Sequence, residues 1–243
     1  MTTSLFRIPL LLTVFAGSSA ACAQGASDGD DSDGTFADAG ALPDSGLAAS
    51  PDADVGPMPL NLTQSTSMAI TADNSVACFN GEVGYTLEAS YYRVFDLPQL
   101  GISDAITIDA LSIGIENAVG GAGASQPAKV VLHSLSQPPS GGVFLVANLT
   151  TLASADIQVA DQATAVLEVP LAANVPAGTR LVAELLVPDG SADGNLLFPG
   201  SNAAGESGPT YVRDGCGGAD DPIEMTQLDV TNMHWVLSLS GAR

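Results

Sequence analysis

Apolar and polar residues alternate along most of the chain beyond residue 60. In the segment 180–187 the odd-numbered positions are Leu, Ala, Leu and Val, and in 235–239 they are Trp, Leu and Leu. A repeat of two residues is typical of a β-strand with one buried face. We predict strands in both segments, and comparable runs lie at 91–97, 106–115, 129–135, 142–149, 156–160, 165–170, 195–198 and 209–213.

Strong turn signals separate these runs, and no stretch of ten residues shows the apolar stripe of a helix. The signals include Gly120-Gly121, Pro138-Pro139, Pro176-Ala177-Gly178 and Pro188-Asp189-Gly190. About ten short strands with such connections predict an all-β fold, namely an antiparallel β-sandwich with jelly-roll-like connectivity. A closed barrel is the alternative. Within 106–115 the apolar phase changes between Ala110 and Leu111, which indicates a β-bulge.

The first 21 residues have the pattern of an export signal. One charge, at Arg7, precedes an apolar run from about residue 8 to 16, and small residues lead to Cys22. The run is too short to span a bilayer as a helix. The signal resembles that of a bacterial lipoprotein, in which Cys22 would carry the lipid. Ser19-Ala20-Ala21 also fits ordinary signal peptidase, which would release a secreted protein instead.

Residues 22–59 differ from the remainder of the chain in composition. After Cys22 they are rich in Asp, Gly, Ala and Ser, contain eight aspartates, and have no Lys or Arg. A segment of this kind cannot bury enough apolar surface to become ordered. We therefore predict a signal peptide at 1–21, a disordered acidic linker at 22–59, and one folded domain at 60–243.

The predicted domain is strongly acidic. It has 19 of the chain's 27 acidic residues and five of the six basic ones. Nucleic acid would be repelled by such a surface, so we exclude it as a partner. The partners that remain are a membrane, through the lipid anchor, and a glycan or an envelope protein.

Four blocks resemble a β-sandwich module of secreted bacterial proteins: 92–97, 112–116, 198–205 and 233–237. In those proteins the module is often an accessory domain beside a peptidase or an adhesin-like region. The resemblance covers most of residues 78–240. It implies export and an accessory or binding role, and it transfers no catalytic residue to this chain.

The cysteines agree with export. If Cys22 is lipidated, Cys78 and Cys216 remain as a pair in an oxidising compartment, where we expect them to form a disulfide. Two unpaired thiols are the alternative.

No catalytic constellation can be assembled from the sequence. Gly205-Glu206-Ser207-Gly208 lacks the last glycine of a nucleophile elbow, because Pro209 follows. His133 and His234 both lie in predicted strands, where we expect packed or surface residues. We therefore expect no enzymatic activity and no cofactor.

Two acidic loops could bind a ligand or support chemistry. Asp189, Ser191 and Asp193 have the spacing of a calcium loop, but the closing glutamate is missing. The same objection applies to residues 28–34. The carboxylates of a second loop could act as glycosidase acids, although a solvated loop is the simpler interpretation; they are Asp214, Asp220, Asp221 and Glu224.

These observations favour a binding or adhesion module displayed on the bacterial cell envelope. Such a module would be marked by exposed aromatic residues. Trp235 lies on an apolar face, so the candidates are Tyr91, Tyr92 and Tyr211. A structural envelope protein without a soluble ligand is the second reading, and an unrecognised hydrolase is the third.

Overall fold

A computed structural model of the chain describes residues 56–216 and 220–243. The predicted signal peptide, Cys22 and most of the predicted linker lie outside this part, so those predictions stay predictions. Within the described residues, no helix has the length and apolar content needed to cross a membrane. The elements, in chain order, are β1 (Pro59–Thr63), β2 (Phe79–Asn80), β3 (Tyr85–Thr86), β4 (Ala89–Asp96), β5 (Ile106–Val119), β6 (Ser125–Leu135), η1 (Val146–Asn148), β7 (Leu149–Ala160), β8 (Gln162–Val175), β9 (Arg180–Val187), β10 (Leu196–Pro199), β11 (Ser201–Asn202), β12 (Thr210–Asp214), β13 (Ile223–Glu224), η2 (Met225–Leu228), β14 (His234–Trp235) and β15 (Leu237–Ala242).

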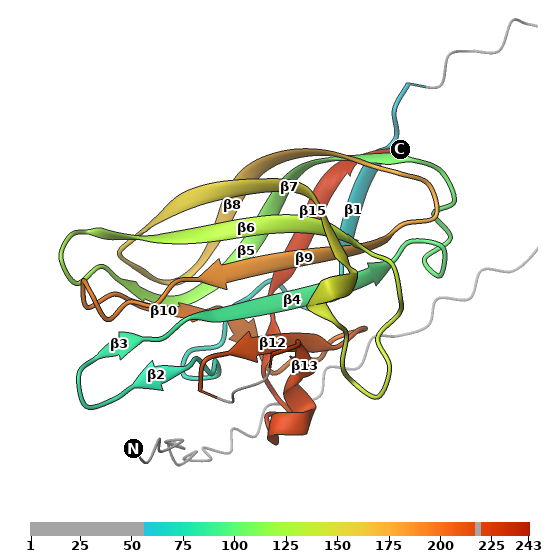
Figure 1. The fold of residues 1–243 in the computed structure, drawn as a ribbon. Helices are drawn as coiled ribbons and strands as arrows, with labels where there is room; N and C mark the ends of the chain where they lie inside the picture. The colour runs from blue at the N-terminus through green and yellow to red at the C-terminus, as the bar shows by residue number, and fades with distance from the viewer. Residues whose placement is uncertain (1–55, 217–219) are drawn as a thin grey trace, which may run out of the picture. The chain divides into compact units, whose positions relative to one another are not determined.

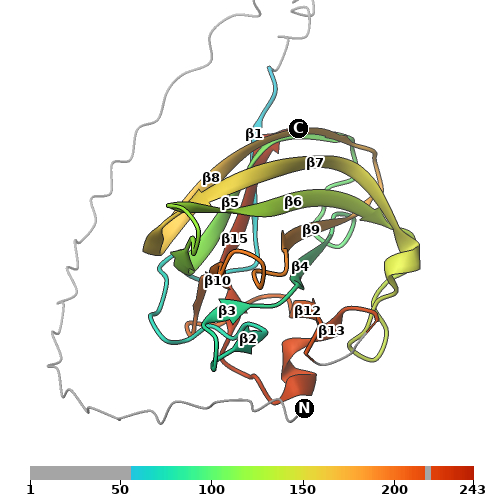
Figure 2. The ribbon, with the colours of Figure 1, turned by 60° about the vertical axis from the view of Figure 1, so that its left-hand side comes forward.

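The strands form two large antiparallel sheets that pack face to face (Figures 1 and 2). One sheet has the order β1-β15-β5-β8, with β10 continuing beside β5 beyond the end of β15. The other has the order β13-β12-β4-β9-β6-β7. The chain crosses between sheets from β4 to β5, from β5 to β6, from β7 to β8 and from β8 to β9. This is jelly-roll connectivity, and it confirms the predicted sandwich.

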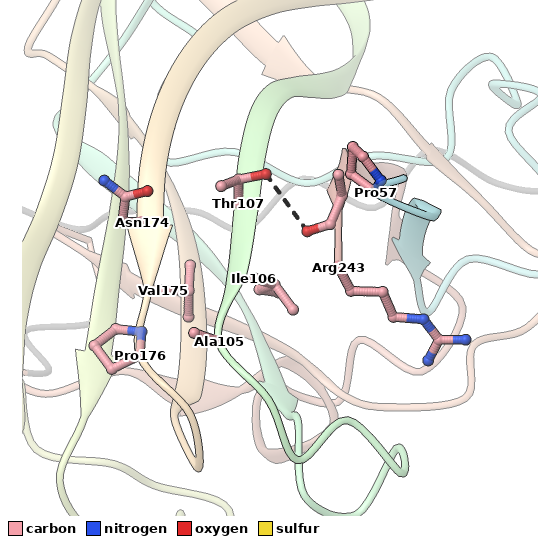
Figure 3. Close-up of a pocket in the computed structure, with 9 residues that line it drawn as sticks. Pro57, Ala105, Ile106, Thr107, Asn174, Val175, Pro176 and Arg243 are labelled. Atoms are coloured by element: carbon pink, nitrogen blue, oxygen red, sulfur yellow. Dashed lines mark hydrogen bonds between the residues drawn. The ribbon is translucent and has the colours of Figure 1, made fainter. Parts of the chain in front are cut away.

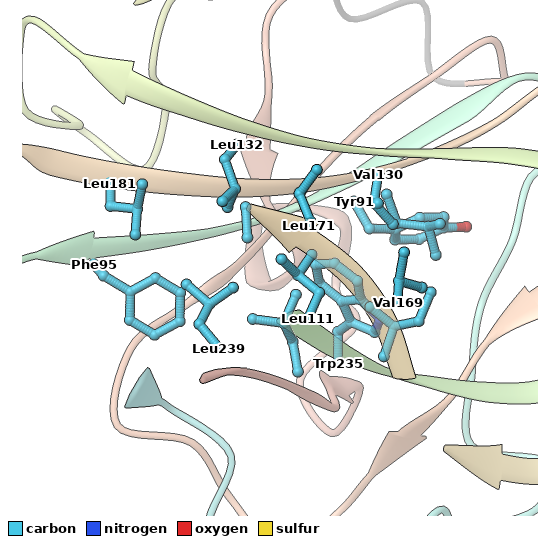
Figure 4. Close-up of a cluster of buried hydrophobic side chains, with 14 of the residues drawn as sticks. Tyr91, Phe95, Leu111, Val130, Leu132, Val169, Leu171, Leu181, Trp235 and Leu239 are labelled. Atoms are coloured by element: carbon cyan, nitrogen blue, oxygen red, sulfur yellow. The ribbon is translucent and has the colours of Figure 1, made fainter. Parts of the chain in front are cut away.

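The hydrophobic core lies between the sheets, as the alternating pattern requires. In β4, Tyr91 and Phe95 point inward and are almost completely buried. They belong to one buried cluster with Leu111 from β5, Leu181 from β9 and Trp235 from β14 (Figure 4). The even-numbered residues of β4 face the opposite way, so this sheet presents a second, outward set of side chains.

The predicted bulge in β5 is present. The register with β15 shifts between Ser240 and Gly241, which pair with Ala110 and Ile108, so Asp109 is the extra residue, one position before the predicted phase change. The bulge lets Ile108 and Leu111 both face the core although three positions separate them.

The predicted strand at 142–149 is wrong. This segment is a loop that ends in η1, and Phe144 is its only fully buried side chain up to residue 148. Phe144 packs edge-on against Tyr92 and Tyr211 on the outward face of the six-stranded sheet. The apolar residues of this segment therefore belong to a loop that packs on a sheet. Alternation in the sequence does not distinguish such a loop from a strand.

Cys78 and Cys216 form the predicted disulfide. Their Cα atoms are 5.6 Å apart and 138 positions separate them in the chain. Cys78 directly precedes β2, and Cys216 follows β12. The bond therefore joins the β2–β3 hairpin to the edge of the six-stranded sheet.

Candidate functional site

The outward face of the six-stranded sheet has a row of hydrogen-bonding side chains. Cross-strand pairing places Tyr92 of β4 opposite Glu184 of β9, and His133 of β6 opposite Thr151 of β7. Glu184, Tyr92 and His133 are buried, although they lie on the side of the sheet away from the core. The loop that carries Phe144 covers part of this face.

Three of these side chains form a hydrogen-bonded relay, which we call the Thr151 relay. Nε2 of His133 lies 2.8 Å from Oε2 of Glu184, and the hydroxyl of Thr151 lies 3.3 Å from Nδ1 of the same ring. Thr151 is exposed, whereas the other two side chains are at most 10% exposed. The relay therefore leads from a buried carboxylate to a hydroxyl in solvent.

The charge of Glu184 follows from its surroundings. Burial raises the pKa of this carboxyl group, but the hydrogen bond from His133 opposes it, and the nearby hydroxyls of Ser90 and Tyr92 act in the same direction as His133. The net shift of the pKa is downward, so Glu184 is ionised at neutral pH. An ionised carboxylate only accepts hydrogen bonds, and Nε2 of His133 must therefore carry a proton.

We expect the domain to lose stability in acid as Glu184 becomes protonated. Its folded-state pKa lies below the ordinary 4.5, so its contribution to stability is present above about pH 4.5 and is lost as the pH falls through the folded value. Glu184→Gln should lower the free energy of unfolding by about 2 kcal/mol at neutral pH. Thermal unfolding followed by circular dichroism at neutral and acidic pH tests this. The difference in stability between Glu184→Gln and the wild type should become smaller in acid. An unchanged difference would contradict the assignment of Glu184 as an ionised carboxylate.

The basic residues within the sheets gather on this same face, apart from the buried Arg93. Lys129 of β6 pairs with Asp156 at 3.5 Å, and Arg180 of β9 pairs with Asp96 at 2.8 Å. Arg213 of β12 lies opposite Ser90, and its Nε is buried without a hydrogen-bond partner among the described residues. The outward face of the other sheet has no Lys or Arg before Arg243.

The three tyrosines predicted to form an exposed aromatic surface are buried. Tyr91 and Tyr92 are each 1% exposed and Tyr211 is 3% exposed. Burial raises the pKa of all three hydroxyls above the ordinary value of 10. Tyr91 lies in the core and the other two pack against Phe144, so the prediction that these tyrosines form an exposed aromatic surface is wrong.

A second polar cluster surrounds Arg93, which projects into the core from β4. Its Nη1 donates to Glu206 Oε2 and to the carbonyl of Gly208, both at 2.6 Å, and its other nitrogens donate to the carbonyl of Trp235. His234 Nδ1 lies 3.3 Å from the same Glu206 oxygen. The segment that only partly resembled a nucleophile elbow thus supplies a structural carboxylate. Both histidines of the chain pair with glutamates, which sequence reasoning did not foresee.

The acidic loops use their carboxylates locally. Asp189 accepts a hydrogen bond from the backbone of Ser191 at 2.8 Å, which closes its own turn. The Ser191 side chain, and to a smaller extent this backbone bond, lower the pKa of Asp189. Asp221 accepts one from the backbone of Val146 at 2.8 Å, and Glu224 lies 3.5 Å from the hydroxyl of Tyr211. In the described part of the chain, no three His, Cys, Asp or Glu side chains are placed to hold a metal ion. Residues 28–34 lie outside this part.

Two shallow hollows lie at the end of the sandwich where β1 begins and β15 ends. The first, of about 310 Å³, is lined mainly by apolar residues such as Pro57, Val175 and Pro176 (Figure 3). The second, of about 350 Å³, follows the edge of β1 and includes Leu100. Arg243 is the only charged residue in either, and neither is lined by a histidine or a carboxylate side chain. Both lie apart from the Thr151 relay.

No protein-family model matches the sequence, and no curated protein matches it significantly. Among solved structures, the chain is similar to a crystal structure of the cysteine protease and lectin-like domains of Cwp84, a surface-layer-associated protein of Clostridium difficile. The identity is 12% and the TM-score is 0.40. The match covers 65% of this chain and 32% of that chain, so it spans about a third of the other protein's length.

Proposed function

We propose that residues 60–243 form the binding module of an exported lipoprotein, anchored through Cys22 to the bacterial cell envelope by the acidic linker at 22–59. The module holds a polyhydroxylated ligand, such as an envelope glycan, on the outward face of its six-stranded sheet. The ligand is bound without turnover.

The distribution of charge is the observation that carries this proposal. The domain is acidic, yet Lys129, Arg180 and Arg213 all lie on one face. A ligand with carboxylate groups would be disfavoured by the acidic surfaces elsewhere and would meet cationic donors here. The Thr151 hydroxyl adds a neutral donor and acceptor on the same face. This combination suits a sugar better than an apolar partner.

The disulfide supports export, since such bonds persist mainly in oxidising compartments. Release as a soluble secreted protein is the alternative to anchoring.

Glycan arrays with the mature protein, in the presence and absence of calcium, test the proposed ligand. Lys129→Gln and Arg213→Gln should each weaken binding about tenfold, the effect of losing one charged hydrogen bond. Glu168→Gln, on the outward face of β8, is the control and should leave binding unchanged. If no glycan binds, the structural envelope role is favoured. If Glu168→Gln weakens binding as much as Lys129→Gln, the face is wrongly assigned.

A further inference from the structure

The Thr151 relay has the hydrogen-bonding order of a nucleophile, a base and an orienting acid. The hydroxyl of Thr151 contacts Nδ1 of His133 at 3.3 Å, and Nε2 of that ring contacts Glu184 at 2.8 Å. A hydroxyl becomes a usable nucleophile when an adjacent base is itself oriented by a third group. Only the hydroxyl end of the relay is exposed to solvent.

The direction of the protons follows from the ionised Glu184. In the neutral tautomer whose proton lies on Nε2, His133 donates to this carboxylate and Nδ1 has a free lone pair. The Thr151 hydroxyl then donates to Nδ1, which leaves a lone pair of its oxygen directed to solvent. The carboxylate also stabilises the imidazolium that forms if the proton moves to the ring.

The backbone next to Thr151 has a β-bulge, which is consistent with a role of Thr151 as a nucleophile. The register between β6 and β7 pairs His133 with Thr151 but Leu132 with Ala153, so Leu152 is an extra, bulged residue. Bulges re-aim neighbouring side chains and often adjoin functional sites. β7 is also the last strand of its sheet, so Thr151 stands at an edge that a reactant can approach.

We propose that Thr151 is an acylation site, which takes one acyl group from a thioester or an aryl ester. The oxygen of Thr151 attacks the carbonyl carbon while its proton passes to Nδ1 of His133. The tetrahedral intermediate then collapses, the bond from carbon to the thiolate or phenolate breaks, and the leaving group takes the proton from His133. The products are an ester on Thr151 and a free thiol or phenol. This reactivity goes beyond ligand binding and does not depend on it.

Treatment of the mature protein with p-nitrophenyl acetate, followed by peptide mass mapping, tests the proposal. We expect one acetyl group on Thr151, none at this site in Thr151→Val, and retained labelling in Thr151→Ser. His133→Gln should slow labelling at least about 100-fold, the usual range for loss of a general base. Thr150→Val is the matched control. Thr150 is exposed as Thr151 is, but it lies opposite Ser134 instead of His133, so this substitution should leave the labelling of Thr151 unchanged.

Two results would overturn the proposal. The first is labelling that does not depend on the relay. It would be seen either as acetylation confined to amines such as Lys129, or as equal rates of Thr151 labelling in the wild type and in a His133→Gln variant whose fold is retained by circular dichroism. The second is release of more than one equivalent of nitrophenol that depends on Thr151, since this would show hydrolytic turnover instead of attachment. The second result would also contradict binding without turnover, whereas the first would leave the glycan proposal intact.

Discussion

The double variant Cys78→Ala/Cys216→Ala should unfold with a free energy about 5 kcal/mol below that of the wild type. The disulfide closes a loop across 138 positions, which include most of both large sheets. In the chain-entropy model, a bond across so long a loop removes much of the conformational freedom of the unfolded state. A domain of this size has a total stability of only about 5–15 kcal/mol, so the loss would be a large fraction of it.

Urea denaturation of the oxidised wild type and the double variant measures this difference. The double variant is preferable to either single one, because a single substitution leaves a free thiol that can pair between molecules. Reduction of the wild type should give the same decrease without any change of sequence. Equal denaturation midpoints for the oxidised and reduced protein would contradict the prediction.

The sandwich could be predicted because most of its strands alternate apolar and polar residues over several positions. In β9 the core-facing residues are apolar at every second position, and on the opposite face Glu184 interrupts the apolar segment 181–187 that follows Arg180. That exception was the available signal for a polar site on the outward face. The partners of Glu184 could not be identified from the sequence. His133 and Thr151 come from neighbouring strands whose register depends on a bulge at Leu152.

The aromatic prediction failed for a related reason. Alternation correctly separates Tyr91 from Tyr92, but it assumes that the outward face of a sheet is in solvent. Phe144 covers Tyr92 and Tyr211, and its loop is held by the hydrogen bond from Val146 to Asp221. A loop that folds back over a sheet is a long-range feature, and no local repeat in the sequence encodes it.

Arg93→Met should lower the free energy of unfolding by about 3–5 kcal/mol. The guanidinium is 1% exposed and connects β4 to Glu206, Gly208 and Trp235. Burial lowers the pKa of Arg93, because it disfavours the charged guanidinium. The carboxylate of Glu206 opposes that shift, because its negative charge stabilises the buried cation. Removal of the cation leaves the partly buried carboxylate of Glu206 without its positive partner and takes one donor from each of two carbonyl oxygens, which is costlier than the loss of an exposed ion pair.

Arg180→Met is the matched control for this prediction. Arg180 also pairs with a carboxylate at 2.8 Å, but its side chain is 22% exposed, so we expect a loss of about 1 kcal/mol or less. Urea denaturation of both variants, together with the double variant Arg93→Met/Glu206→Gln, separates the two effects. Since the second substitution removes the stranded charge, the double variant should be more stable than Arg93→Met alone. Equal losses for Arg93→Met and Arg180→Met would show that burial of the guanidinium does not determine its contribution.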